Sequence, residues 1–221
     1  MIDIHNLSKS YRVTNRWHCV LDNISICFPS DRNIGILGLN GAGKSTLLRL
    51  IGGVESPDKG EIYRDVRVSW PIGFSGGILP DMTGREGTRF VTRIYGGSIK
   101  EVEKFVQDFA ELGEYFDMET KTYSAGMRAR LGFAISMAMD FDCYLVDEVT
   151  AVGDQRFRNK YHNEFLKRKE KSNLLMVSHQ PHTIKEYCDM SAVLHNGKIT
   201  LYDSVEEGMQ AYSDMIKAEE R

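Results

Sequence analysis

Residues 38–45 read Gly38-Leu39-Asn40-Gly41-Ala42-Gly43-Lys44-Ser45 and match the phosphate-binding loop pattern G-x-x-x-x-G-K-[ST] at every fixed position. The apolar run 34–37 before the loop predicts a buried strand, and residues 46–51 after it predict a helix. A strand, a glycine-rich turn and a helix in this order are the context that the pattern requires. The stretch therefore predicts an α/β fold that binds a nucleotide.

The residue types of the loop suit phosphate binding. Glycine lets the backbone turn tightly, so that successive N–H groups and the positive end of the following helix face an anion. Lys44 adds a positive charge, and the Ser45 hydroxyl is a candidate ligand for Mg²⁺. A plain glycine-rich turn would explain the glycines but not the Lys-Ser pair that follows them. The nucleotide-binding candidates here are Gly38, Asn40, Gly41, Ala42, Gly43, Lys44, Ser45 and Thr46.

Two carboxylates follow a second apolar run. Residues 143–146 predict a buried strand that ends at Asp147 and Glu148. Because ligands of open α/β sheets lie beyond the carboxyl ends of the strands, we expect Asp147 to reach a Mg²⁺ ion at Ser45. We expect Glu148 to polarise an attacking water. Without the phosphate loop, the same pair would be interpreted as a solvated strand end.

Residues 123–127, Tyr-Ser-Ala-Gly-Met, open a predicted helix with apolar residues at 131, 134, 135 and 138. Here the chain resembles the ATP-binding cassette (ABC) family, in which a Leu-Ser-Gly-Gly-Gln segment begins such a helix. The chain keeps Ser124 and Gly126 and differs at the other three places. The resemblance implies a P-loop ATPase that hydrolyses ATP with Mg²⁺. It also implies a homodimer, in which Ser124 and Gly126 serve the nucleotide held by the other copy.

Three further residues match family elements by their order. Asp154 matches the aspartate of a loop that crosses the dimer interface, and His179 matches a histidine that contacts the γ-phosphate and the attacking water. Tyr11 matches the aromatic residue that stacks on adenine. An ordinary strand aromatic is nearly as good an explanation of Tyr11. The resemblance therefore implies Lys44, Glu148 and His179 as catalytic residues.

One position departs from the family pattern. The family places a glutamine that touches Mg²⁺ after the strand near residues 68–70, but residues 41–100 contain no glutamine. Our alignment puts Leu79 or a direct neighbour at that site. Leucine cannot bind Mg²⁺, so the contact is absent, replaced by water or supplied by Asp81. We expect lower activity or altered coupling.

The 221 residues predict a single nucleotide-binding domain. Residues of about 1–83 and 141–221 are expected to form a mixed-sheet α/β core with an N-terminal antiparallel β subdomain, in which residues 1–28 form short strands. Residues of about 84–140 are expected to form an inserted helical lobe, in which 99–112 has helical periodicity. Asn196-Gly197 predicts a hairpin turn, and a last amphipathic helix is expected from about Val205.

Composition excludes some classes of protein. The formal net charge of -3 argues against a broad nucleic-acid surface, so we expect no nucleic-acid partner. The apolar runs are far shorter than the roughly 20 residues that cross a bilayer, and the N-terminus lacks the features of a secretory signal. The four cysteines have no paired metal-binding spacing and are interpreted as reduced thiols.

Within the family, the resemblance narrows to exporters of bacterial capsular polysaccharide. The segments that carry it are 69–73, 83–86, 121–128 and 146–154. It implies integral-membrane permease partners, a lipid-linked polysaccharide as the transported substrate and a location at the cytoplasmic face of the inner membrane. The alternatives are a teichoic-acid or O-antigen exporter, a non-transport ATPase of DNA repair or translation, and a regulatory module that binds ATP without turnover.

Overall fold

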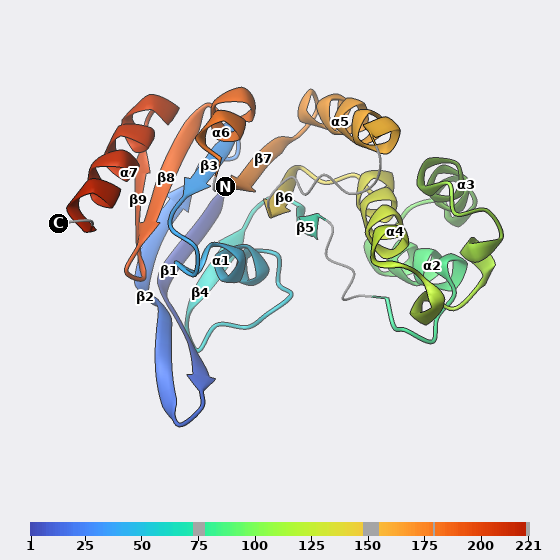
Figure 1. Ribbon diagram of the computed structural model, residues 1–221, viewed down its shortest axis with the longest axis horizontal. Coiled ribbons are helices and arrows are strands. Elements are labelled where there is room, and N and C mark those ends of the chain that lie inside the picture. Colours follow the sequence, from blue (N-terminus) through green and yellow to red (C-terminus); the bar gives the residue numbers. More distant parts are fainter. Residues whose placement is uncertain (73–77, 148–154, 179, 220–221) are drawn as a thin grey trace. The chain divides into compact units, whose positions relative to one another are not determined.

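The structure is a computed structural model that describes residues 1–72, 78–147, 155–178 and 180–219. Contacts divide these residues into two compact units. One unit contains the strands with helices α1, α6 and α7, and the other contains helices α2, α3, α4 and α5 (Figure 1). Two sheets and helices in one chain confirm the expected α/β class with an antiparallel β subdomain.

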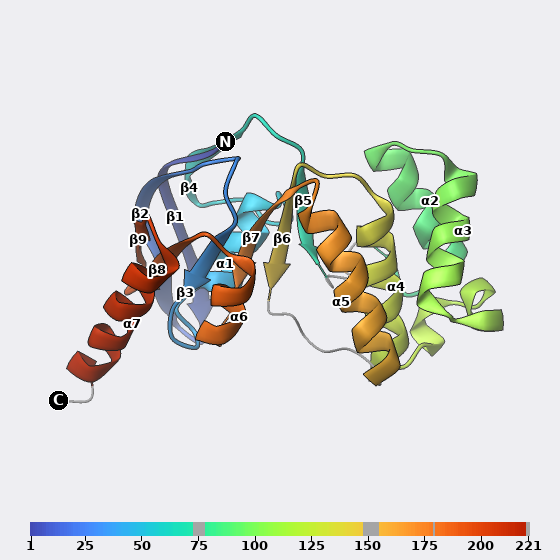
Figure 2. The same ribbon diagram turned by 90° about the horizontal axis from the view of Figure 1, so that it is seen from above.

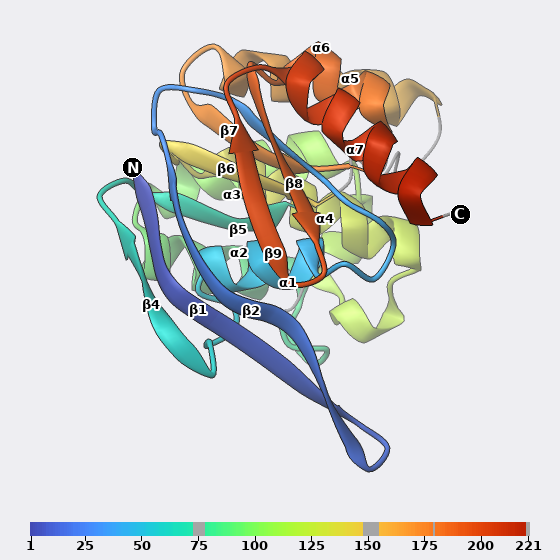
Figure 3. The ribbon, with the colours of Figure 1, turned by 90° about the vertical axis from the view of Figure 1, so that its left-hand side faces the viewer.

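The first sheet is antiparallel and has the strand order β2-β1-β4. Its strands are β1 (Ile2–Val13), β2 (Arg16–Phe28) and β4 (Lys59–Arg64). Residues 1–28 form one long hairpin instead of several short strands, and Figure 3 shows its tip extending from the rest of the sheet. Register shifts between Ile4 and Ser10 let the strand continue through places where the alternation of apolar residues breaks.

The second sheet is mixed and has the order β5-β6-β7-β3-β8-β9. Its strands are β5 (Val68–Ile72), β6 (Cys143–Asp147), β7 (Asn173–Val177), β3 (Ile34–Leu37), β8 (Met190–His195) and β9 (Lys198–Tyr202). The pairs β6–β7, β7–β3 and β3–β8 are parallel, whereas β8 and β9 form an antiparallel hairpin. Asn196 and Gly197 both have positive φ, 48° and 72°, which confirms the expected turn.

Helix α1 (Lys44–Ile51) shares one buried core with both sheets. Leu47, Leu48 and Ile51 of this helix are completely buried. They belong to the same cluster as Ile4 of the antiparallel sheet and Ile36 of the mixed sheet. This packing fixes the helix that follows the phosphate loop. Helices α6 (Pro181–Tyr187) and α7 (Val205–Glu219) contact β3 and β8, respectively, and the expected last helix from Val205 is confirmed.

The helical unit consists of elements that lie side by side in Figure 2. They are α2 (Gly84–Tyr95), α3 (Ile99–Ala110), α4 (Ala125–Ala138) and α5 (Gln155–Lys169), with short 3-10 helices η1 (Gly113–Asp117) and η2 (Thr120–Thr122). Helix α3 ends two residues before the expected residue 112, because Glu111 has a left-handed φ of 50°. Helix α5, outside the expected lobe of 84–140, packs on α4 because the Tyr161 ring stacks on Phe133 with centroids 3.6 Å apart.

No helix in the described parts of the chain is both long and apolar enough to span a bilayer.

Candidate functional site

The phosphate loop follows strand β3, whose four residues are all buried between β7 and β8. Gly38 is the first residue after the strand. A Cβ at this position would lie 2.5 Å from the main-chain oxygen of Leu194 in β8. Because a main-chain atom of a buried strand cannot move aside, glycine is the residue that lets the loop leave the sheet here.

The loop turns into α1 through two glycines with positive φ, 82° at Gly41 and 101° at Gly43. Gly43 is the N-cap of α1, and its carbonyl accepts the main-chain N–H of Leu47 at 2.9 Å. A Cβ at Gly43 would lie 2.5 Å from Cγ1 of Val20 in β2, whereas one at Gly41 would meet no atom of the described residues within 4 Å. The hairpin β1–β2 therefore encloses one side of the loop at Gly43.

Lys44 lies inside the loop. Its side chain is buried, with 7% exposure, and its Nζ donates to the main-chain oxygens of Gly38 at 2.7 Å and Leu39 at 2.9 Å. The first turn of α1 contains no acidic residue that would compensate the positive end of the helix. The loop therefore presents a lysine cation and a helix N-terminus at one place, which suits an anion such as phosphate.

Ser45 and Asp147 meet although 102 positions separate them in the sequence. Asp147 is the last residue of β6, and the Ser45 Oγ donates to its Oδ1 at 3.0 Å. A hydroxyl and a carboxylate are hard oxygen ligands of the kind that Mg²⁺ takes from protein, with water and phosphate oxygens completing its shell. This pair therefore fits the metal role expected for both residues, which stays a prediction.

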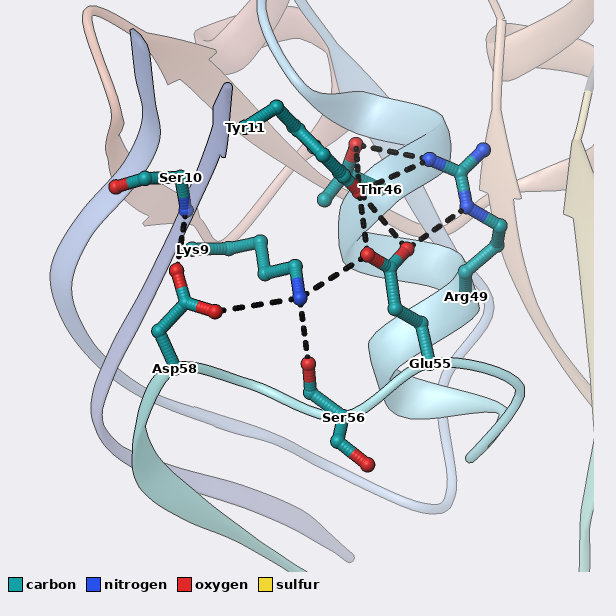
Figure 4. A network of polar contacts seen from close by, with 8 residues as sticks. All are labelled: Lys9, Ser10, Tyr11, Thr46, Arg49, Glu55, Ser56 and Asp58. Atoms are coloured by element: carbon teal, nitrogen blue, oxygen red, sulfur yellow. Dashed lines mark hydrogen bonds and ion pairs between the residues drawn. The ribbon is translucent and has the colours of Figure 1, made fainter. Parts of the chain in front are cut away.

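Tyr11 lies on β1 beside the first turns of α1, and its hydroxyl points toward that helix (Figure 4). It is 2.8 Å from both carboxylate oxygens of Glu55 and 3.4 Å from Oγ1 of Thr46. Arg49 Nη2 donates to the Tyr11 oxygen at 3.3 Å and to Thr46 Oγ1 at 3.1 Å. Tyr11, the residue expected to stack on adenine, is thus hydrogen-bonded to Thr46, which directly follows Ser45.

Sequence reasoning missed Glu55, Arg49 and Lys9 in this network. Burial tends to raise the pKa of the Glu55 carboxyl, but hydrogen bonds from its neighbours outweigh burial and hold that pKa below its ordinary value. One signal was present in the sequence. Thr46 and Arg49 are three positions apart, so they occupy one face of α1.

Ser124 and Gly126 lie at the start of α4 in the helical unit. Ser124 is exposed, and its Oγ accepts the main-chain N–H of Met127 at 3.2 Å as an N-cap. Among the described residues, the one atom within 4 Å of a Cβ at Gly126 would be Ser124 Oγ, at 3.8 Å. The expected segment therefore begins a helix, and its role toward a second copy stays a prediction.

Three candidates, Glu148, Asp154 and His179, lie outside the described residues. Leu79, at or next to the expected glutamine position, is described and 60% exposed. Asp81, offered as a substitute Mg²⁺ ligand, lies in the helical unit and forms an ion pair of 3.0 Å with Lys121.

The family model for ABC transporters matches residues 21–151 of this chain. This segment includes the phosphate loop, the start of α4 and the Ser45–Asp147 pair. The chain belongs to the ABC transporter family. The expected resemblance is confirmed.

Curated relatives cover almost the whole ABC chain. It is 50% identical over 215 residues to the polysialic acid transport ATP-binding protein KpsT of Escherichia coli, with 96% of each chain covered. It is 44% identical to the capsule polysaccharide export ATP-binding protein CtrD of Neisseria meningitidis, with 97% of this chain and 100% of the relative covered. The teichoic acids export ATP-binding protein TagH of Staphylococcus epidermidis is 34% identical, with 98% and 89% covered.

A solved structure has the same fold. The dimeric ATP-binding cassette MJ0796, bound to ADP and Pi, superposes with a TM-score of 0.73 at 19% identity and covers 92% of this chain and 98% of its own. At this level of identity, the similarity supports the ABC ATPase fold and nothing finer.

Proposed function

We propose that this chain is the ATP-hydrolysing subunit of an exporter that moves capsular or another lipid-linked surface polysaccharide across the inner membrane. The phosphate loop carries the proposal, because it brings Lys44, the N-terminus of α1 and the Ser45–Asp147 pair to one place. The higher identity to capsule exporters than to TagH favours capsular polysaccharide over teichoic acid. An O-antigen exporter and a non-transport ATPase stay as alternatives.

Binding of ATP would use groups that the loop already holds in position. Lys44 Nζ now donates to two carbonyl oxygens, and phosphate oxygens would replace these acceptors with stronger, charge-assisted ones. Ser45 and Asp147 would hold Mg²⁺, which when bound neutralises charge on the phosphates. Tyr11 would stack on the adenine ring.

Hydrolysis would need a base and a second copy of the chain. Glu148 would accept a proton from the attacking water, and His179 would contact the γ-phosphate. Ser124, Gly126 and Asp154 would complete the site of the other copy, which makes the working unit a homodimer. This dimer would act with integral-membrane permease subunits at the cytoplasmic face of the inner membrane.

The first test separates nucleotide binding from general stability. Lys44→Ala should abolish tight ATP binding, measured with labelled ATP at equilibrium, because it deletes the loop cation. Lys59→Ala is the matched control, since Lys59 is an exposed lysine of β4. Affinity unchanged within about threefold in Lys44→Ala, a difference under 1 kcal/mol, would refute the site assignment.

The second test concerns turnover. Glu148→Gln keeps the size of the side chain and removes the base, so the variant should bind ATP, stop hydrolysing it and accumulate as a dimer in size-exclusion chromatography. Hydrolysis at the parental rate would mean that another group is the base.

The third test concerns the dimer. Ser124→Arg should bind ATP but not hydrolyse it, because a large cation replaces a small hydroxyl at the start of α4. A Ser124→Arg protein that is monomeric with ATP yet fully active would contradict a site completed by two copies.

The transported substrate is tested in the cells that encode the chain. Deleting its gene should remove a polysaccharide from the cell surface and leave that polymer inside. Chemical analysis of the lost polymer separates capsule from teichoic acid and O-antigen. Restoration by the Lys44→Ala gene as well as by the Lys59→Ala gene would contradict an ATP-driven export step.

A further inference from the structure

Glu55 follows α1 and forms the centre of a network that joins three segments of the chain (Figure 4). Its carboxylate accepts the Tyr11 hydroxyl from β1 and Nε of Arg49 from α1, the latter at 3.2 Å. Lys9 Nζ, also from β1, lies 3.1 Å from its Oε1. Two cations and a phenol therefore hold one carboxylate, which stabilises its charged form.

The network fixes the Tyr11 hydroxyl in both of its hydrogen-bonding roles. The phenol donates its proton to Glu55 and accepts a hydrogen bond from Arg49 Nη2. Strand β1 fixes the main-chain end of the residue, and the hydroxyl contacts fix the far end of the ring. The phenol oxygen lies on the axis about which the ring turns, so fixing both ends sets the direction of that axis. Because the O–H bond lies in the plane of the ring, its donation toward Glu55 favours one ring plane.

A separate carboxylate holds the strand itself. Asp58 accepts the main-chain N–H of Ser10 at 2.7 Å and forms an ion pair with Lys9 at 3.3 Å. Asp58 thus supports β1 next to Tyr11. Lys9 links the two carboxylates, because its Nζ pairs with both Glu55 and Asp58 and lies 5.6 Å from the centroid of the Tyr11 ring. The hydrogen bonds of the phenol oxygen are with Glu55, Thr46 and Arg49, whereas the Asp58 carboxylate contacts Lys9 and the main chain of Ser10.

The same network reaches the phosphate loop. Arg49 Nη2 donates to Thr46 Oγ1 at 3.1 Å, and Thr46 directly follows Ser45 in the first turn of α1. The ring of Tyr11 is consequently held at a set position relative to the place where phosphate is expected to bind. A flat aromatic ring held in this way is a preformed stacking platform for a base, because the ordering of the side chain precedes binding.

We propose that Glu55, acting with Arg49, is a positioning residue for recognition of the nucleotide base: it holds the Tyr11 ring where the purine of a nucleoside triphosphate stacks. The inference rests on the proposed function, since it requires that the phosphate loop binds ATP. Under this proposal Glu55 supports binding of the base, whereas the phosphate loop binds the phosphates. Removing Glu55 should weaken the contribution of the base to affinity and spare that of the phosphates.

The test compares ATP with inorganic tripolyphosphate, which has the phosphates and no base. Both are measured with Mg²⁺, as competitors of a labelled ATP, against the parental chain and five variants. Tyr11→Ala removes the ring and should weaken ATP binding by roughly 5- to 150-fold, the range for loss of one base–aromatic stack. Glu55→Ala should weaken ATP binding by at least about threefold, a part of that loss, and leave tripolyphosphate within about twofold.

Three variants separate positioning from general support. Glu55→Gln keeps an oxygen acceptor and should lie between the parental chain and Glu55→Ala. Tyr11→Phe keeps the ring and removes the hydroxyl that Glu55 and Arg49 hold, so it should weaken ATP binding at least as much as Glu55→Ala and leave tripolyphosphate within about twofold. Glu61→Ala is the matched control, since Glu61 accepts the hydroxyl of Tyr63 on the exposed strand β4, and it should change neither affinity.

Each contrary result has its own meaning. Equal weakening of ATP and tripolyphosphate in Glu55→Ala would show that Glu55 supports the whole site, and an unchanged ATP affinity would show that it positions nothing; either result overturns the inference. ATP binding that survives Tyr11→Ala unchanged overturns it too, but leaves the proposed ATPase function standing. A parental chain that binds neither ATP nor tripolyphosphate overturns the proposed function itself.

Discussion

Replacing Gly43 by alanine should lower the free energy of unfolding more than the same change at Gly41. Both glycines have positive φ, 101° and 82°, so alanine adds about 1–2 kcal/mol of left-handed strain at either site. Both changes also restrict the unfolded chain, which offsets about 0.4–1 kcal/mol. These two contributions nearly cancel in the comparison of the two variants.

The space around the two glycines makes the difference. The new methyl group at 43 would lie 2.5 Å from Cγ1 and 3.2 Å from the carbonyl oxygen of Val20, whereas at 41 no atom in the described part of the chain lies within 4 Å. Overpacking of this kind costs about 1–3 kcal/mol, which is therefore the expected difference between Gly43→Ala and Gly41→Ala.

Thermal unfolding without nucleotide measures this difference without any contribution from phosphate binding. For a chain of this length, 1 kcal/mol shifts Tm by about 2–4 °C, so Gly43→Ala should melt about 2–12 °C below Gly41→Ala. Circular dichroism at 222 nm, where helices absorb, follows the transition. A Gly41→Ala protein that melts at the same temperature as Gly43→Ala, or below it, would refute the role of Val20 in enclosing the loop.

Three further predictions concern buried or paired groups. Ser69→Ala should lower the free energy of unfolding in urea by about 1–3 kcal/mol, because the buried Leu145 N–H loses its acceptor at 2.9 Å; an unchanged midpoint would contradict this. The folded pKa of Glu55 is lowered, so its stabilising contribution is present above pH 4.5 and is lost as the pH falls through that folded pKa. The difference in Tm between the parental chain and Glu55→Gln should therefore shrink below pH 4.5, and a constant difference would refute this assignment. Burial raises the pKa of the Cys143 thiol to about 12, so iodoacetamide should label exposed Cys19 in the native protein and Cys143 only after unfolding, as mass spectrometry would show.

Local spacing explains why the sequence predicted some elements well. The strand, loop and helix around residues 34–51 follow from an apolar run and from glycines that permit positive φ, both of which are properties of neighbouring residues. The hairpin turn at Asn196-Gly197 is local for the same reason. The end of α3 was less predictable, because Leu112 is buried and continues the apolar spacing although the helix has already ended.

The sequence alone also determined the family and the residue types of the site, since the phosphate loop, the Ser124–Gly126 segment and the acidic pair of 147 and 148 can be recognised by their order along the chain. Only the tertiary structure decided which of these residues meet. Asp147 reaches Ser45 because parallel pairing places β7 between β6 and β3, an order that the chain does not follow in sequence. Glu55 reaches Tyr11 because packing of the hairpin against α1 brings together a donor and an acceptor 44 positions apart. Hydrogen bonds between distant segments depend on strand order and packing. Neither can be derived from the spacing of residues along the chain.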